Sequence, residues 1–91
     1  MARPPGQAKK KTRELLEAQQ AFGRAVRKLR ERKQLSQEEL AADAKLHRNY
    51  IGLVERGVVN PTLWSLMRLA KALQVEASRL IAETEREASR H

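Results

Sequence analysis

Arg48 and Asn49 are adjacent residues whose side chains match the edges of base pairs. The fork of an arginine guanidinium fits O6 and N7 of guanine, and an asparagine amide fits N6 and N7 of adenine, each bidentate pair discriminating by roughly 1 to 3 kcal/mol. We interpret both as base readers at the start of a helix, where side chains reach deepest into a major groove. The alternatives are a solvated arginine and an asparagine that makes a local hydrogen bond.

The helix that must carry these readers is predicted over residues 47–56. Ile51 and Val54 recur three residues apart and claim its inward face, and Gly57 supplies the left-handed stop that often follows a helix. Leu53 lies about one turn beyond the readers, on a face that is free for a partner. We interpret it as a third base-contacting residue, suited to a thymine methyl group.

A second short helix is predicted just before this one. Ser36 is a good N-cap, and Glu39 stands where its side chain completes a capping box. One apolar face follows over about two turns, formed by Leu40, Ala41 and Ala44. Only residues 45–47 separate the two helices, so they must be joined by a tight turn. Two short helices joined in this way form the layout of a DNA-reading helix-turn-helix.

Helical periodicity also extends to both sides of this pair. A helix is predicted from Thr12 to Lys33, weakened by about 1 kcal/mol at Gly23, so that its first turns form a separate or frayed segment. A fourth helix is capped by Thr62, and a fifth begins near Glu76 and carries Leu80 and Ile81.

The predicted helices divide the chain into one domain and two polar ends. Residues 1–11 have no apolar period and read as a disordered basic arm, which either wraps DNA or serves as a solubilising tail. Residues 12–82 form the domain, and residues 83–91 read as a polar carboxyl-terminal tail too polar to bury.

Composition favours a small module that binds a polyanion. The 91 residues carry 19 basic and 11 acidic side chains, a formal net charge of +8, for which nucleic acid is the natural partner. There is no cysteine, which favours a reducing cytosol, and no apolar run approaches the roughly 20 residues needed to span a bilayer. We expect a cytoplasmic protein that does not associate with membranes.

The run from residue 35 to residue 73 resembles the phage repressor and Cro type of helix-turn-helix protein, whose relatives include the controller proteins of restriction-modification systems. The matching segments are LSQEELA, YIGLVERG and NPTLWSLMRLAKAL. The resemblance covers roughly residues 22–80 and implies an all-α, compact five-helix domain. Lys45 departs from it, standing where the family most often has a glycine with positive φ, at a cost of roughly 1 to 2 kcal/mol.

Phosphate contacts are expected where helix starts present backbone amides and a favourable dipole. The resemblance points to two such places, Gln37 at the first helix of the pair, and Thr62 with Leu63 at the fourth helix. Arg56 can reach the groove edge or a phosphate. We expect Trp64 to be a half-buried packing residue rather than a DNA contact.

Further roles are implied by the resemblance alone. At the positions of Arg30 and Glu55 the family often carries a partly buried ion pair that ties the first helix to the reading helix; the alternative is a solvated Glu55. Operators of the family commonly contain two half-sites, so a homodimer is expected. From the sequence itself, Ile81 on the last helix is the best apolar candidate for the interface, unless it closes the monomer core instead.

No pattern in the sequence suggests an enzyme. His47 and His91 are isolated, no Ser/His/Asp or H-E-x-x-H arrangement is present, and the four glycines form no phosphate-cradling loop. We therefore predict no catalysis, no cofactor and no metal site, and see no evident small-molecule ligand. The predicted function is a dimeric, sequence-specific transcription regulator that binds double-stranded DNA with helix 47–56 in the major groove. An antitoxin or a protein-binding adaptor with the same fold is the alternative.

Overall fold

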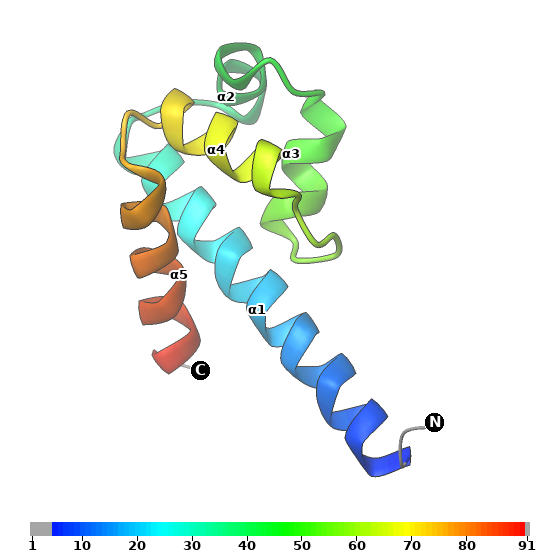
Figure 1. Cartoon of the computed structure of the whole chain (residues 1–91). Coiled ribbons are helices and arrows are strands. Elements are labelled where there is room, and N and C mark those ends of the chain that lie inside the picture. The colour runs from blue at the N-terminus through cyan, green and yellow to red at the C-terminus, as the bar shows by residue number, and fades with distance from the viewer. Residues whose placement is uncertain (1–4, 91) are drawn as a thin grey trace.

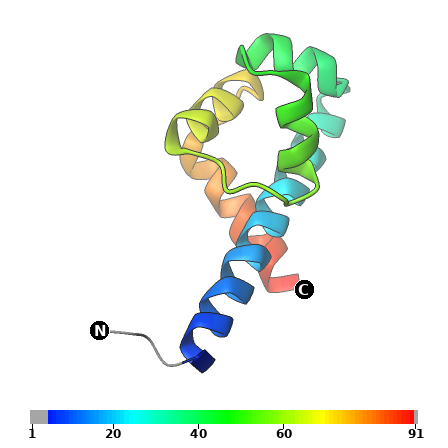
Figure 2. The same cartoon turned by 90° about the vertical axis from the view of Figure 1, so that its right-hand side faces the viewer.

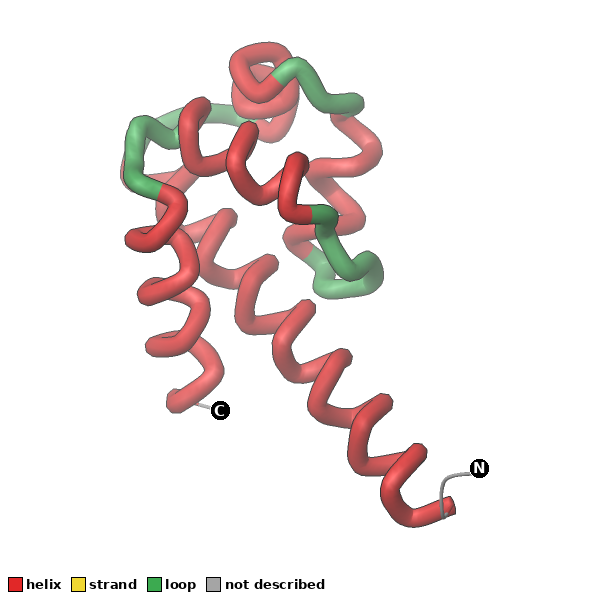
Figure 3. Tube along the Cα trace, in the orientation of Figure 1, coloured by secondary structure: helices red, strands yellow, loops and turns green. Residues whose placement is uncertain are grey.

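The computed structural model describes the backbone of residues 5–90 and the side chains of residues 9–90. This range contains five helices and no strand (Figure 1, Figure 3), which confirms the predicted all-α fold. The helices are α1 (Pro5–Arg32), α2 (Gln37–Ala44), α3 (Arg48–Glu55), α4 (Leu63–Ala72) and α5 (Ala77–Arg90). Together they enclose one hydrophobic core to which every helix contributes buried side chains.

Helix α1 is the longest of the five helices. It packs against α5 and α3, while α2 contacts α3 and α4 (Figure 1). Its inward stripe is Ala21, Phe22, Ala25, Val26 and Leu29, all buried. Residues 9–18 are exposed instead, and this half of α1 extends away from the other helices (Figures 1 and 2).

The extent of α1 corrects two expectations. Residues 5–11, predicted as part of a disordered arm, are helical and continuous with the rest of α1; Arg3 of that arm lies outside the described residues. The segment has Pro5 at the first helical position and is rich in good helix formers, which accounts for the helix. Gly23 does not interrupt α1. A Cβ there would lie 2.4 Å from the carbonyl oxygen of Val54, so glycine allows α3 to approach.

The caps of the central helices form as predicted. The Ser36 hydroxyl accepts from the Glu39 amide at 3.0 Å, and the Glu39 carboxylate accepts from the Ser36 amide at 2.9 Å. Lys45 ends α2 in the left-handed conformation, with φ 56° and ψ 43°, so the turn keeps its geometry without a glycine. The amide of Leu46 closes it by donating to Ala41 at 2.9 Å. Gly57 has φ +72° and follows α3.

Helix α5 corrects the expected polar tail. It continues to Arg90, and Glu83 and Glu87 within it are only 4% and 6% exposed, although residues 83–91 were predicted to be too polar to bury. Burial is tolerated because cations surround both carboxylates. Glu87 accepts from Lys28 of α1 at 3.2 Å, and Glu83 from Arg86 at 2.6 Å.

The same cations set the protonation of these two acids. A hydrogen bond from Lys28 lowers the pKa of Glu87 against the opposing effect of burial, helped by the charges of Lys28, Arg90 and Arg24. Burial alone would raise the pKa of Glu83, but a hydrogen bond from Arg79 and the neighbouring arginine charges lower it. Both carboxylates are therefore held ionised. Glu83 pairs with arginines within α5, and Glu87 joins α5 to α1 through Lys28.

Two kinds of feature are absent from the part of the chain that the structure describes. None of its helices is long and apolar enough to cross a membrane. Among the same residues, no group of histidine, cysteine and acidic side chains is arranged to hold a metal ion.

Candidate nucleic-acid interface

The three predicted base readers lie together on the outer side of α3. Ile51 and Val54 are 0% and 1% exposed and anchor the inner side of the helix, which leaves Arg48 and Asn49 exposed and Leu53 partly exposed. Because the amphipathic pattern fixes which side is buried, the position of the readers follows from the core.

These readers line a single hollow of about 510 Å³. The residues that line it are Gln37, Arg48, Asn49, Gly52, Leu53 and Arg56. The hollow thus brings the three predicted readers together with two of the predicted phosphate contacts. Figure 2 shows α3 on the near face of the molecule, with the loop that joins it to α4.

The amino end of α3 is held by a contact that sequence reasoning did not identify. The Nδ1 atom of His47 accepts from the amide of Asn49 at 3.2 Å, so His47 caps the helix and α3 begins one residue later than predicted, at Arg48. The cap uses the backbone amide of Asn49, and the side chain of Asn49 stays exposed.

Arg48 has one neighbour that bears on readout. Its Nη1 atom lies 3.3 Å from a carboxylate oxygen of Glu38 on α2, and both side chains are more than 60% exposed. A pair this exposed contributes at most about 1 kcal/mol, so it does not fix the side chain of Arg48 in this position. No local pattern signals this pair, because the two residues are on different helices.

The expected ion pair between Arg30 and Glu55 is present. Arg30 Nε donates to Glu55 Oε2 at 2.6 Å and Nη2 donates to Oε1 at 3.0 Å, with the two side chains 13% and 4% exposed. The hydrogen bond to Glu55 also raises the pKa of Arg30, and this effect outweighs burial. The pair joins α1 to α3 and neutralises the acid on the reading helix.

Gln37 takes part in the same network. Its Nε2 atom donates to Glu55 Oε1 at 3.0 Å, which holds its side chain at the edge of the hollow. Glu55, a residue of α3, thereby accepts hydrogen bonds from Arg30 of α1 and from Gln37 of α2. The phosphate contact of Gln37 stays a prediction, for which the second N–H of its side-chain amide and the backbone amides at this helix start are the available donors.

The second predicted anion region lies at the start of α4. The Thr62 hydroxyl accepts from the amide of Ser65 at 3.0 Å and caps the helix as expected, and Leu63 is 73% exposed. Trp64 corrects a prediction, because it is 59% exposed rather than half-buried in packing. The guanidinium of Arg68 covers one face of its ring, 4.2 Å from the centroid.

The dimer candidate lies away from these contacts, on α5. Ile81 is 42% exposed, whereas its neighbour Leu80 is fully buried and closes the core. Its exposed side chain is available to a partner, and its role at an interface stays a prediction.

Comparison with known proteins places this geometry in context. Residues 26–80 match the model of the family described as helix-turn-helix. The control protein C.SmaI of Serratia marcescens is 50% identical over 56 residues, which cover 62% of this chain and 67% of that protein. The crystal structure of the restriction-modification controller protein C.AhdI from Aeromonas hydrophila is 45% identical, with a TM-score of 0.67 over 68% of this chain and 94% of that chain.

A third relative was solved with nucleic acid. The tetramer of the restriction-modification controller protein C.Esp1396I, in complex with its natural 35 base-pair operator, is 30% identical to this chain. The TM-score is 0.73, over 78% of this chain and 93% of that chain.

Proposed function

This chain belongs to the helix-turn-helix family, and from that premise we propose that it is a sequence-specific DNA-binding transcription regulator of the controller or repressor kind. It acts without enzymatic chemistry, in the cytoplasm, on double-stranded operator DNA. The observation that carries the proposal is the exposed hollow on α3, where residues suited to bases and residues suited to phosphates meet on one surface.

Base readout is assigned to the side chains at the amino end of α3. Arg48 takes a guanine, Asn49 takes an adenine, and Leu53 contacts a thymine methyl group one turn further along. The exposure of Arg48 and Asn49 supports this assignment. So does the pairing of Glu55 with Arg30, because it removes an unpaired negative charge that phosphates would repel.

Phosphate contacts fix the register of α3 on the duplex. We assign them to the amides that open α2 at Gln37, to those that open α4 beside Thr62 and Leu63, and to the exposed side chain of Arg56. Charge supports the assignment, since the formal net charge of +8 draws the protein to any duplex.

The functional unit is a two-fold dimer that places two reading helices about 34 Å apart, one turn of DNA. Ile81 on α5 is the assigned interface residue, since it is a large apolar side chain that is 42% exposed. The C.Esp1396I assembly on its operator supports the use of more than one copy by a protein of this kind.

Selection of bound sequences from random DNA at physiological salt tests the proposal. The wild-type protein is expected to enrich a motif of two related half-sites with centres about 10 base pairs apart. Ile81→Asp is expected to shift the protein toward the monomer in sedimentation and to weaken binding to the paired site far more than to a half-site. Recovery of no motif by the wild type would overturn the proposal.

A further inference from the structure

We propose that Arg68 is a positioning residue for base readout, which fixes the turn between α2 and α3 by joining it to α4. The inference rests on the proposed function, because it concerns how the readers of α3 are aimed. Arg68 itself belongs to α4, a helix with no base-reading role in the assignments above.

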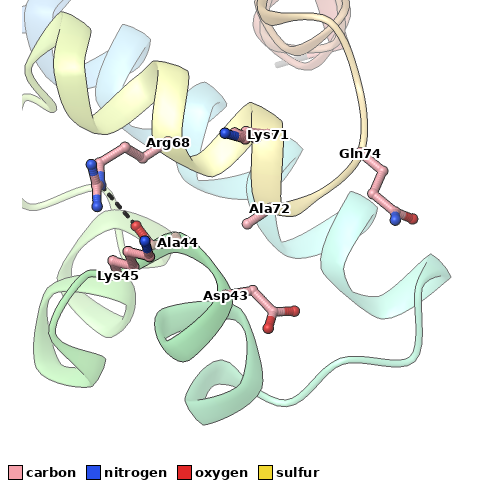
Figure 4. A pocket seen from close by; sticks show the side chains of 7 residues that line it. All are labelled: Asp43, Ala44, Lys45, Arg68, Lys71, Ala72 and Gln74. Carbon is pink, nitrogen blue, oxygen red and sulfur yellow. Dashed lines mark hydrogen bonds between the residues drawn. The ribbon is translucent and has the colours of Figure 1, made fainter.

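The contact that carries the inference joins Arg68 to the end of α2. Arg68 Nε donates to the carbonyl oxygen of Ala44 at 2.9 Å, as Figure 4 shows. Ala44 is the last residue of α2, and the last carbonyls of a helix have no partner within it. A guanidinium placed there satisfies one of them and also meets the negative end of the helix dipole.

The backbone bonds of the turn serve other carbonyls. The amide of Lys45 donates to Ala41 and Ala42, and the amide of Leu46 donates to Ala41. The left-handed Lys45 is itself a conformation that costs a non-glycine residue roughly 1 to 2 kcal/mol. The bond from Arg68 therefore holds the end of α2 at the point where this unfavourable conformation begins.

Trp64 holds the arginine in place. It lies one turn before Arg68 on α4, and the guanidinium carbon of Arg68 lies over its ring, 4.2 Å from the centroid. A planar guanidinium can stack on a ring and donate in its plane at the same time, whereas the round ammonium of lysine cannot reproduce both contacts. The contact with Trp64 thus limits the positions from which Arg68 can donate to Ala44.

The turn determines where the readers point. Residues 45–47 are the whole connection, and His47 caps the first turn of α3 through the amide of Asn49, so a shift of the turn moves Arg48 and Asn49 with it. Binding groups must be held within about 0.5 Å to recognise a partner. Because Arg68 belongs to α4, it also couples this turn to the helix whose start is assigned to phosphate.

A residue of a second hollow, beside Arg68, is the matched control. Lys71 lies on α4 near Arg68 and lines this hollow of about 460 Å³ with Asp43, Lys45 and Gln74 (Figure 4). It is an exposed cation, whereas Arg68 is half-buried, and none of the described contacts ties it to the turn. Removal of Lys71 therefore changes the charge of the second hollow and leaves the bond to Ala44 intact.

The test compares Arg68→Ala, Arg68→Lys and Lys71→Ala with the wild type. Each protein is titrated against the selected operator and against operators with one changed base in each half-site, over a series of salt concentrations. Both Arg68 variants are expected to lose about tenfold in discrimination between these operators with an unchanged salt dependence. Lys71→Ala is expected to keep the discrimination of the wild type.

Trp64 provides a second readout, because it is the only tryptophan of the chain. Its fluorescence is expected to shift in the folded Arg68 variants and to stay unchanged in Lys71→Ala. Arg68→Lys keeps the charge and most of the side chain, so it decides the question if Arg68→Ala does not fold.

Three outcomes would overturn the inference. Full discrimination in a folded Arg68→Lys protein would show that the turn does not need this contact. A smaller salt slope with full discrimination in Arg68→Ala would make Arg68 a phosphate contact instead. A wild-type protein that selects no sequence would overturn both the proposed function and this inference. The first two outcomes would overturn the inference alone.

Discussion

Replacing Gly23 by alanine is expected to destabilise the protein, although the substitution improves helix propensity. Gly23 lies inside α1, where alanine is favoured by about 1 kcal/mol over glycine. A Cβ at this position would lie 2.4 Å from the carbonyl oxygen of Val54 and 2.6 Å from that of Glu55. Both obstructing atoms are backbone of α3, so no side-chain rotation can relieve the contact.

The magnitude follows from these opposing effects. Overpacking that forces backbone shifts costs typically 1 to 3 kcal/mol and occasionally more, and here α3 must move away from α1 as a unit. Because two backbone oxygens obstruct the Cβ, we expect a cost at the upper end of this range, about 3 kcal/mol. Less the gain of about 1 kcal/mol in helix propensity, Gly23→Ala is expected to lower the free energy of unfolding by about 2 kcal/mol. At about 4 to 8 °C for each kcal/mol in a domain of this size, Tm is expected to fall by roughly 8 to 16 °C.

Gly52→Ala is the matched control on the other helix of the contact. The nearest atom to a Cβ at Gly52 is Gln37 Oε1 at 3.9 Å, an ordinary van der Waals distance. This substitution is therefore expected to raise Tm by a few degrees through helix propensity. The assay is thermal unfolding followed by circular dichroism, with urea titration as a second measure. A Gly23→Ala protein as stable as the wild type, or one stabilised like Gly52→Ala, would refute the close approach of α1 and α3.

Three further predictions follow from charged groups. Arg30→Ala leaves a buried carboxylate without its cation and is expected to lower the free energy of unfolding by about 3 to 5 kcal/mol in urea denaturation. The control, Arg27→Ala, breaks the exposed pair with a glutamate one turn away and is expected to change stability by less than about 1 kcal/mol. Equal losses in the two variants would contradict the buried network. The pKa values of Glu83 and Glu87 in the folded protein lie below the ordinary one, so both residues bind fewer protons in the folded than in the unfolded protein. The stability that they contribute is present above about pH 4.3, and it disappears as the pH falls through their pKa values in the folded protein. Replacing both by glutamine is expected to reduce the loss of stability between about pH 5 and about pH 3, as judged by a smaller difference between the urea midpoints at these two pH values than in the wild type; a difference like that of the wild type would argue against it. Alanine at the three lysines of residues 9–11 is expected to weaken binding to every DNA sequence while base preference stays. The slope of log affinity against log salt concentration is expected to fall by up to about 0.9 for each phosphate that is no longer neutralised. Unchanged affinity would make this half of α1 a solubilising segment.

The parts of the fold that could be predicted are those with local signals. Ser36 and Glu39 form their capping box, and Thr62 caps α4, because each cap needs only residues three positions apart. The buried side of α3 followed from the spacing of Ile51 and Val54, and the exposure of Arg48 and Asn49 followed from the buried side.

The parts that could not be predicted depend on residues far apart in the chain. Glu87 is buried because Lys28, 59 residues away, donates to it, whereas local polarity suggested an exposed tail. Gly23 resembles a weak point in a helix when only its neighbours in sequence are considered, but it faces the carbonyl oxygens of α3. The bond from Arg68 to Ala44 spans 24 residues and leaves no pattern in the sequence.

Base preference of the Arg48→Ala protein tests the central assignment most directly. Wild type and variant are each carried through selection from random DNA at physiological salt, with Arg56→Ala as the control that removes a cation assigned to phosphate. We predict that Arg48→Ala loses preference for guanine at one position of each half-site, a relaxation of roughly 1 to 3 kcal/mol, and that Arg56→Ala keeps the motif with lower affinity. The same motif, with guanine retained at every position in Arg48→Ala, would contradict the account.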